Sequence, residues 1–212
     1  MMIRGAIVLG MTLGAALFAQ TPGADAAWRP LFDGKSLTGW KQSEFFGAGK
    51  VRVQDGQILI GTGVLTGITW AAAAAPVPRT NYEIRVEAQR VSGSDFFAGI
   101  TFPVGDSYCT WINGGWGGRV VGLSSINGAD AAGNETTLDW LFQTGRWYTL
   151  RLRVTPARIS AWIDQDRVID VSIAGKWIAL REGDIDRSLP FGIATYDTVG
   201  AVRRIEWRPL AQ

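Results

Sequence analysis

The sequence predicts an all-β protein, a β-sandwich or jelly roll built from two antiparallel sheets. Three observations support this prediction. Segments in which apolar and polar residues alternate recur along the chain, turn residues such as Gly, Pro, Asp and Asn separate them, and no convincing amphipathic helix is present. We therefore expect strands throughout residues 28–212, in a single domain of a length that suits one sandwich.

The first residues read as a targeting segment rather than as part of the fold. A short basic start around Arg4 precedes an apolar run at 5–19, which is too short to span a membrane comfortably. Ala24-Asp25-Ala26 has the small-x-small pattern of a signal peptidase site. We expect residues 1–27 to be a removed signal peptide, of bacterial appearance, and the mature chain to be secreted or periplasmic, without a membrane span.

The mature chain begins with an anchoring segment followed by a hairpin. Residues 28–40 carry apolar side chains around the turn dipeptide Asp33-Gly34, and we expect them to dock onto the domain. Residues 51–53 and 58–60 flank Asp55-Gly56 and predict two short strands joined by a tight turn. The alanine-rich run at 69–77 is interpreted as a strand end and a loop.

The clearest strand is predicted at 82–91, and residues 147–154 repeat its pattern. In the first of these, Tyr82, Ile84, Val86 and Ala88 alternate with charged residues, which indicates one buried face and one solvated face. Strands are also predicted at residues 96–103, 108–113, 120–125, 159–163, 168–173, 191–196 and 202–207. Only 175–189 could hold a short helical turn.

Several classes of function are excluded by what the sequence lacks. There is no histidine, which excludes a histidine-based triad and any zinc site or proton shuttle that needs imidazole. Cys109 is the only cysteine, so no intramolecular disulfide can form. The net charge of +2 is small and scattered, and no phosphate-binding glycine loop is present, so we expect neither nucleic acid nor nucleotide as a partner.

The polar residues that could do chemistry gather between 92 and 137. A glycine-rich connector, Gly114-Gly115-Trp116-Gly117-Gly118, lies in the middle of this stretch and allows sharp turns and close approach. An indole between two glycine pairs is as readily presented to a ligand as buried. Around it lie Asp95, Asp106, Asn113, Arg119, Asn134 and Glu135.

Several segments of the chain resemble the 3-keto-disaccharide hydrolase domain family. Residues 31–40 (LFDGKSLTGW) resemble the start motif of that family, and residues 53–56 the strand and turn that follow it. Residues 81–87 resemble its central strand, and the later strands its closing pairs. The resemblance covers nearly all of the mature chain. It implies a concanavalin A-like jelly roll, an exported protein, and hydrolysis of disaccharides carrying a ketone at sugar carbon 3.

Two differences from the family pattern bear on activity. Many members have a Tyr-Glu-x-Gln-Ile strand where this chain has Tyr108-Cys109-Thr110-Trp111-Ile112, so a thiol replaces the acidic residue and an indole replaces the amide. Some members use a histidine, in some cases with a metal, and this chain has none. Both differences favour a non-catalytic role.

A 3-keto group acidifies the hydrogen on carbon 2, so cleavage needs a base, a group that stabilises the enolate, and an acid for the leaving sugar. Without histidine the base must be a carboxylate, and the candidates are Glu135, Asp95 and Asp106. For Asp95 and Asp106 the simpler interpretation is that they cap turns, whereas for Glu135 the two interpretations are balanced. Arg119 and the backbone N–H groups of residues 114–118 would stabilise the enolate.

Trp111 and Trp116 are the expected sugar platforms, because pyranose rings lay their C–H faces on indole, and Asn113, Arg119 and Asn134 are expected to contact the same ligand. Core packing is the alternative for either tryptophan. Ordinary glycoside hydrolysis would need two facing carboxylates, and the nearest pattern, Glu182-Gly183-Asp184-Ile185-Asp186, is interpreted as solvated surface.

We expect no cofactor, with a structural calcium ion at Asp184/Asp186 or Asp164/Asp166 as an alternative. The first hypothesis for function is a secreted enzyme acting on 3-keto-glycosides. The second is a non-catalytic glycan-binding module on the same scaffold, with a saccharide as ligand in either case. The third is a structural envelope or adhesion module.

Overall fold

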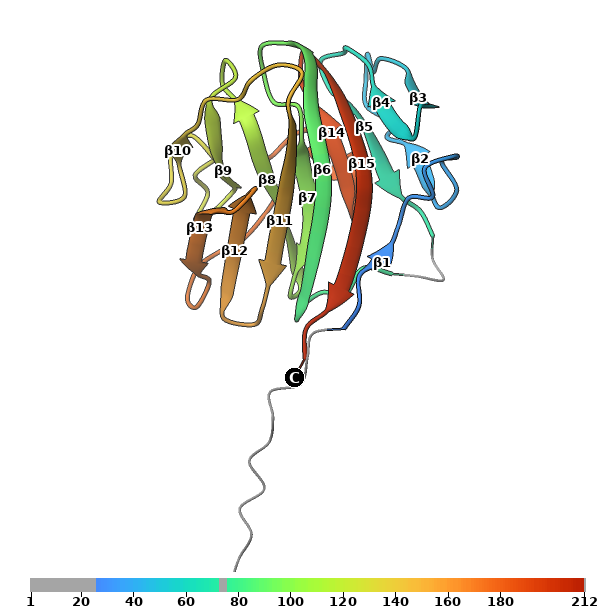
Figure 1. The fold of residues 1–212 in the computed structure, drawn as a ribbon. Coiled ribbons are helices and arrows are strands. Elements are labelled where there is room, and N and C mark those ends of the chain that lie inside the picture. The colour runs from blue at the N-terminus through green and yellow to red at the C-terminus, as the bar shows by residue number, and fades with distance from the viewer. Residues whose placement is uncertain (1–25, 73–75, 212) are drawn as a thin grey trace, which may run out of the picture.

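A computed structural model describes residues 26–72 and 76–211. The expected signal peptide therefore lies outside the described residues except for its last two positions. Two antiparallel sheets stack face to face, as expected for a jelly-roll sandwich (Figure 1). The predicted fold class is confirmed.

The larger sheet has eight strands, and every pairing in it is antiparallel. Its strands, in spatial order, are β13 (Asp166–Ser172), β12 (Arg158–Ile163), β11 (Trp147–Val154), β6 (Tyr82–Gly93), β15 (Thr198–Pro209), β4 (Gln57–Ile60) and β3 (Val51–Gln54), with β1 (Arg29–Pro30) pairing to β15.

The smaller sheet has seven strands and carries the candidate site on its outer face. Its strands, in spatial order, are β10 (Leu138–Asp139), β9 (Val120–Ser124), β8 (Ser107–Gly115), β7 (Gly99–Val104), β14 (Gly192–Thr195), β5 (Thr66–Trp70) and β2 (Trp40–Gln42). In the described part of the chain the only helix is the short 3₁₀ turn η1 (Asp184–Ser188), which falls inside the segment where a helical turn was expected.

The core lies between the sheets and follows the predicted alternation. Tyr82, Ile84 and Val86 of β6 are fully buried, and so are the matching residues of β11, because both strands turn these side chains toward the seven-stranded sheet. The N-terminal segment docks as expected. Trp40 is buried, its indole Nε1–H donates to the carbonyl of Leu31 at 2.8 Å, and its ring meets that of Trp70 edge-on at 5.1 Å.

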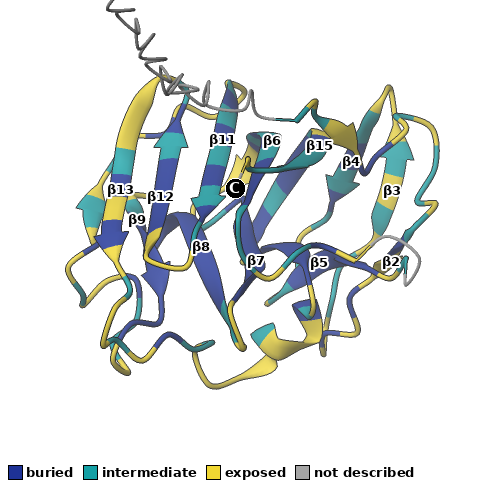
Figure 2. Ribbon diagram, turned by 90° about the horizontal axis from the view of Figure 1, so that it is seen from below, coloured by how far each residue is buried: buried dark blue, intermediate teal, exposed yellow. Residues whose placement is uncertain are grey.

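The two sheets differ in their outer faces, which Figure 2 shows by burial. Strands β6 and β11 alternate buried and half-buried residues over most of their length, whereas β5, β7 and most of β8 are buried on both faces. The segment containing η1 packs over the outer face of the seven-stranded sheet at β5 and β14. The hydroxyl of Thr69 on β5 donates to the carbonyl of Arg187 at 2.9 Å and anchors that segment.

The outer face of the eight-stranded sheet is a layer of arginines over carboxylates. Glu83 of β6 is fully buried, yet its two oxygens accept hydrogen bonds from Arg151, Arg153 and Arg208, with N–O distances of 2.8 Å. The Arg151 guanidinium also lies 3.8 Å from the centroid of the Trp162 ring. Three partners satisfy a charge that would otherwise be costly to bury.

Candidate functional site

A cavity of about 480 Å³ opens on the outer face of the seven-stranded sheet, and we call it the Trp116 pocket. Thr110 and Ile112 of β8 and Ser124 of β9 contribute to its lining. Thr110 also shares a hydrogen bond with Thr101 on β7, with the two hydroxyl oxygens 3.0 Å apart. The pocket therefore rests on a hydroxyl-bearing sheet surface of the kind that suits a polar ligand.

One wall of the pocket is the glycine-rich turn between β8 and β9. Trp116 has a left-handed backbone, with φ of 47°, and its side chain is 42% exposed. Gly118, at φ of 100°, passes so close to the Ser94 carbonyl that a Cβ would lie 2.8 Å from that oxygen. The expectation that this connector presents an indole is consistent with this geometry, because glycines on either side let the chain turn tightly around it.

Two side chains hold this turn in place. Oδ2 of Asp95 accepts the backbone N–H of Gly117 at 3.0 Å, and Oδ1 accepts the N–H of Phe96 at 2.7 Å. From below, the buried Arg90 guanidinium donates through Nη2 to the carbonyls of Gly118 and Gly114 at 2.9 and 3.3 Å. Burial lowers the pKa of Arg90, and the Asp95 carboxylate opposes that shift. The tryptophan is thus carried on a braced loop.

The opposite wall is formed by the segment that leads into η1. The Arg181 guanidinium lies 5.6 Å from the centroid of the Trp116 ring, a cation–π contact that joins the two walls. Glu182 and Asp184 also line the pocket. Asp184 pairs with Arg187 at 3.4 Å, whereas Glu182 has no hydrogen bond or ion pair with any described residue. This acidic segment was interpreted as solvated surface. It is exposed, but it borders the cavity.

Two further aromatic rings contribute apolar surface. Phe96 and Tyr196 line the pocket, and their ring centroids are 5.9 Å apart. Tyr196 directly follows β14 and remains 39% exposed. Indole, phenol and phenyl rings therefore lie beside a guanidinium and one unpaired carboxylate, Glu182. This is the mixture of flat apolar faces and hydrogen-bonding groups that sugar rings require.

Of the three predicted catalytic carboxylates, the structure places only Asp95 at this pocket. Asp106 lies at the turn between β7 and β8 and lines a different cavity. Glu135 forms an ion pair with Lys176, and this hydrogen bond lowers the pKa of the Glu135 carboxyl. The polar residues of 92–137 are therefore near in sequence but divided between different parts of the surface.

The predicted ligand contacts are divided in the same way. Trp111 is wrong as a sugar platform, because β8 turns it into the core together with Cys109 and leaves it 0% exposed. Asn113 is wrong as a ligand contact, because it is fully buried and its amide donates to the Ala98 carbonyl at 3.0 Å. Trp116 alone of the two tryptophans is accessible.

Asn134 and Arg119 have structural partners of their own. The Asn134 amide donates to the carbonyls of Leu123, Ala129 and Asp130 at 2.7–3.1 Å, which organises the loop after β9. Arg119 forms a bidentate ion pair with Asp139, in which Nε and Nη2 donate to the two carboxylate oxygens at 2.6 and 2.8 Å. This pair raises the pKa of Arg119. Neither residue lines the Trp116 pocket.

Sequence reasoning missed Arg181, Glu182 and Tyr196 as pocket residues. They lie 65 or more positions beyond Trp116 in the sequence, and no local pattern links them to it. The available signal was that Arg181–Asp186 is a charged connecting segment, and binding and catalytic residues lie disproportionately on such loops.

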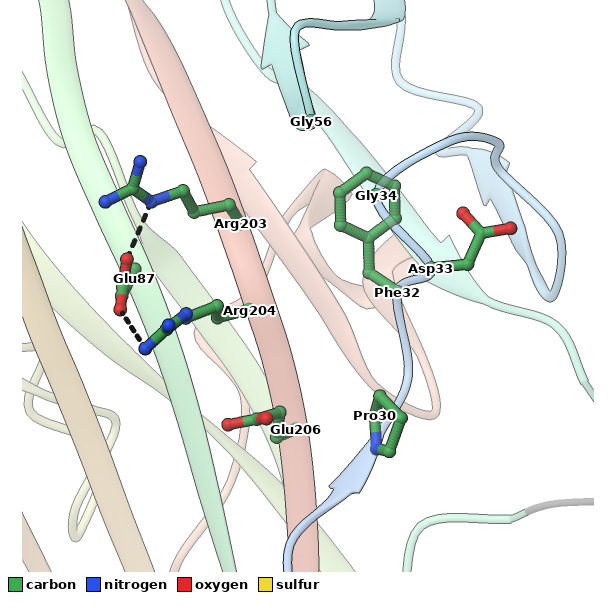
Figure 3. A pocket seen from close by; sticks show the side chains of 9 residues that line it. All are labelled: Pro30, Phe32, Asp33, Gly34, Gly56, Glu87, Arg203, Arg204 and Glu206. Carbon is green, nitrogen blue, oxygen red and sulfur yellow. Dashed lines mark hydrogen bonds and ion pairs between the residues drawn. The ribbon is translucent and has the colours of Figure 1, made fainter.

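A second cavity, of about 550 Å³, lies between the N-terminal segment and the outer face of the eight-stranded sheet (Figure 3). A bulge in β15 directs Arg203 and Arg204 to the same carboxylate, Glu87, at 2.6 and 3.2 Å. Of its other carboxylates, Glu206 pairs with Arg85 and Asp33 accepts backbone N–H groups. The ring of Phe32 faces the arginines from the opposite side (Figure 3). The arrangement accounts for docking of the N-terminal segment.

In each pair of carboxylates named as calcium candidates, one member has another partner. No group of three or more histidine, cysteine, aspartate or glutamate residues is gathered in the described part of the chain. Asp164, one of the calcium candidates, accepts the Thr149 N–H at 2.8 Å and pairs with Arg146 at 2.7 Å, while Asp184 pairs with Arg187. No helix of the described residues is long and apolar enough to cross a membrane.

Solved structures with the same architecture share little sequence with this chain. The Crh5 transglycosylase in complex with NAG is 13% identical with a TM-score of 0.57, covering 90% of this chain and 87% of its own. The carbohydrate binding module CBM66 from Bacillus subtilis is 13% identical with a TM-score of 0.54, covering 80% and 95%.

Domain 4 of AbnA, an extracellular arabinanase from Geobacillus stearothermophilus, in complex with arabinotriose, is 13% identical with a TM-score of 0.52, covering 81% and 82%. At this level of identity the three similarities show the fold alone.

No curated protein gives a significant match to the sequence. A family model does match, and it spans residues 27–208. The chain therefore belongs to the family of 3-keto-alpha-glucoside-1,2-lyase-like domains, the family that the opening motif and the strand pattern indicated.

Proposed function

We propose that this protein is an exported enzyme that cleaves the glycosidic bond of 3-keto-glycosides at the Trp116 pocket. The observation that carries the proposal is the composition of that pocket: an accessible indole, a guanidinium beside it, and an unpaired carboxylate, Glu182. Family membership supports the substrate class. Residues 1–27 would be the export signal and residues 28–212 the single mature domain.

The chemistry needs a base near carbon 2 of the sugar and a positive group near the ketone oxygen. In our assignment the Glu182 carboxylate removes the hydrogen on carbon 2, and Arg181 stabilises the enolate oxygen that forms at carbon 3. The enolate then reforms the ketone, a double bond forms between carbons 1 and 2, and the bond from carbon 1 to the leaving sugar oxygen breaks. That oxygen takes up the proton that Glu182 removed from carbon 2, so the Glu182 carboxylate is ionised again.

Addition of water to the double bond completes the hydrolysis. The hydroxyl adds to carbon 1 and a proton returns to carbon 2, so the sum is one water consumed and one glycosidic bond cleaved. The first half alone is an elimination, which agrees with the word lyase in the family description.

Trp116 would bind the keto sugar by stacking, with Asp95 keeping the turn in position. Asp95 is a positioning residue in this scheme, because both of its oxygens already accept backbone N–H groups. This replaces the sequence-based hypothesis in which Glu135, Asp95 or Asp106 acts as the base.

A non-catalytic glycan-binding module is the second candidate. One observation on β8 favours it. Cys109 stands where many relatives have an acidic residue, so the strand has no carboxylate at that position. The thiol is also fully buried, so it cannot act in place of the acid. In this case the Trp116 pocket would bind a saccharide without turnover.

The test is incubation of residues 28–212 with 3-keto-trehalose and 3-keto-lactose in D₂O. We expect monosaccharide release, deuterium at carbon 2 of the keto sugar, and transient ultraviolet absorbance from the conjugated enone. Glu182→Gln should lose turnover but keep binding, while Glu135→Gln, a matched change of an exposed carboxylate outside the pocket, should behave as the wild type. Binding without turnover by the wild type would select the glycan-binding function, and neither binding nor turnover would exclude both.

A further inference from the structure

A third cavity, of about 510 Å³, shares no residue with the Trp116 pocket. It is lined by the turn between β7 and β8, the turn between β11 and β12, and the segment that follows β13, so it opens where ends of both sheets meet. We call it the Trp177 groove. Its volume lies within the range of about 300–1,000 Å³ that is usual for small-molecule sites.

Trp177 provides the groove with a large aromatic surface that the fold leaves uncovered. Its side chain is 67% exposed. On one side the ring lies over Gly128, where a Cβ would be 3.7 Å from the ring atom Cζ3. The ring is therefore supported on one side, and most of the remaining surface is free to meet a ligand.

The backbone that carries this indole is held firmly. The N–H of Trp177 donates to Oδ1 of Asn127 at 2.9 Å, and the N–H of Asn127 donates back to the Trp177 carbonyl at 2.8 Å. The next residue, Ile178, accepts the Ser107 hydroxyl at 2.7 Å and is buried. A ring on a fixed support loses little conformational entropy on binding, which is the property of a preformed platform.

Polar groups of both signs surround the platform. Asp106 lines the groove and has no hydrogen bond or ion pair with any described residue. Lys176 also lines it, with its ammonium held by Glu135. The rest of the lining is mixed: Val104, Pro156 and Ile173 are apolar, and Thr80, Ser107 and Thr155 carry hydroxyls. Since Glu135 neutralises Lys176, the groove keeps one unpaired carboxylate, Asp106, which can accept hydrogen bonds from the hydroxyls of a neutral ligand.

We infer that the Trp177 groove is a second saccharide site, which binds a neutral oligosaccharide by stacking one ring on Trp177 and hydrogen-bonding hydroxyls to Asp106. The ligand class follows from the lining of this groove, and the site is independent of catalysis at the Trp116 pocket. The site gives a role to two carboxylates that the sequence analysis named as catalytic candidates and that the proposed reaction does not use. Asp106 lines the groove, and Glu135 holds the Lys176 ammonium at its edge.

The test labels the chain with 5-fluorotryptophan and follows each indole by ¹⁹F NMR, with the Trp177 resonance assigned by its loss in Trp177→Phe. Maltohexaose, cellohexaose, laminarihexaose and xylohexaose are the probes. We expect at least one of them to shift the Trp177 resonance, and Trp177→Ala to raise the dissociation constant at least about tenfold. Asp106→Asn should weaken binding less.

The matched control is Phe46→Ala, another exposed aromatic residue, which lies outside the groove and should leave binding unchanged. A Trp177 resonance that none of the four probes shifts would overturn the inference. So would unchanged affinity in Trp177→Ala, or an effect of Trp177→Ala on self-association instead of on sugar binding. Glu182→Gln separates the two sites, because it should abolish turnover and leave the Trp177 shift intact.

Discussion

The Oδ2 atom of Asp95 accepts the backbone N–H of Gly117 at 3.0 Å, joining two loops that are 22 positions apart in the sequence. This one contact fixes the residue next to Trp116, the only one of the two expected sugar-binding tryptophans that is accessible. The position of the indole in the pocket thus depends on a carboxylate that would otherwise be taken for a simple turn cap.

Replacing Asp95 should affect ligand binding more than the chemical step. In Asp95→Ala the turn loses its acceptor, and we expect KM for a 3-keto-glycoside to rise about fivefold or more while stability falls by about 1 kcal/mol. Asp95→Asn keeps one acceptor oxygen and should be intermediate. Steady-state kinetics and thermal melting measure both effects, with Asp139→Ala as the control because that carboxylate lies outside the pocket. An unchanged KM in Asp95→Ala would show that the bond does not position Trp116.

Arg90 should be needed for folding of the same loop. Its buried Nη2 donates to the carbonyls of Asp95, Gly114 and Gly118, and its guanidinium lies 5.3 Å from the centroid of Phe97. Arg90→Met removes the donor from these carbonyls, and we expect a loss of about 2–4 kcal/mol in the free energy of unfolding by urea. Arg90→Lys should recover only part, since one ammonium cannot reproduce the planar geometry. A loss below about 0.5 kcal/mol in Arg90→Met would contradict the assigned role.

Stability should fall in acid through Glu83. Burial raises the pKa of this carboxyl, but the hydrogen bonds from Arg208 and Arg153 outweigh burial, and the pKa is lowered from its ordinary value of 4.5. A lowered pKa means that the ionised form stabilises the fold. The contribution is complete above pH 4.5 and is lost as the pH falls through the lower value in the folded state.

The check on Glu83 is urea unfolding between neutral pH and acid for the wild type and Glu83→Gln. We expect Glu83→Gln to be less stable than the wild type by about 2 kcal/mol at neutral pH, because three arginines lose their charged partner. The loss is no larger because these arginines are partly exposed, so water can solvate them. The difference between the two proteins should shrink in acid. A constant difference at all pH values would assign the effect to packing rather than to charge.

Cys109 should be chemically silent in the folded protein. Burial raises the pKa of its thiol to about 12, and the side chain has no exposed surface. Since the thiolate is the reactive form, we expect no reaction with Ellman's reagent under native conditions and full reaction in urea. The labelling rate at intermediate urea should follow the unfolded fraction. Fast labelling of the native protein would mean that β8 opens locally.

The sequence alone determined the fold class, the family and most of the strands, because each of these depends on local patterns. Alternation in 82–91 and 147–154 identified the core faces of β6 and β11, since their other faces are charged and only one assignment is physically reasonable. Strand β5 was recognised only as a strand end. It is buried on both faces, so no alternation marks it.

Only the tertiary structure decided the site. On β8 the period of two showed that Cys109 and Trp111 share a face, but both faces of that strand are covered, so polarity could not show which face meets the core. Packing against the eight-stranded sheet turned Trp111 inward and left Thr110 and Ile112 to the pocket. Folding brings together Trp116, Arg181 and Glu182, which come from distant segments of the chain. No local sequence pattern predicts that they are neighbours.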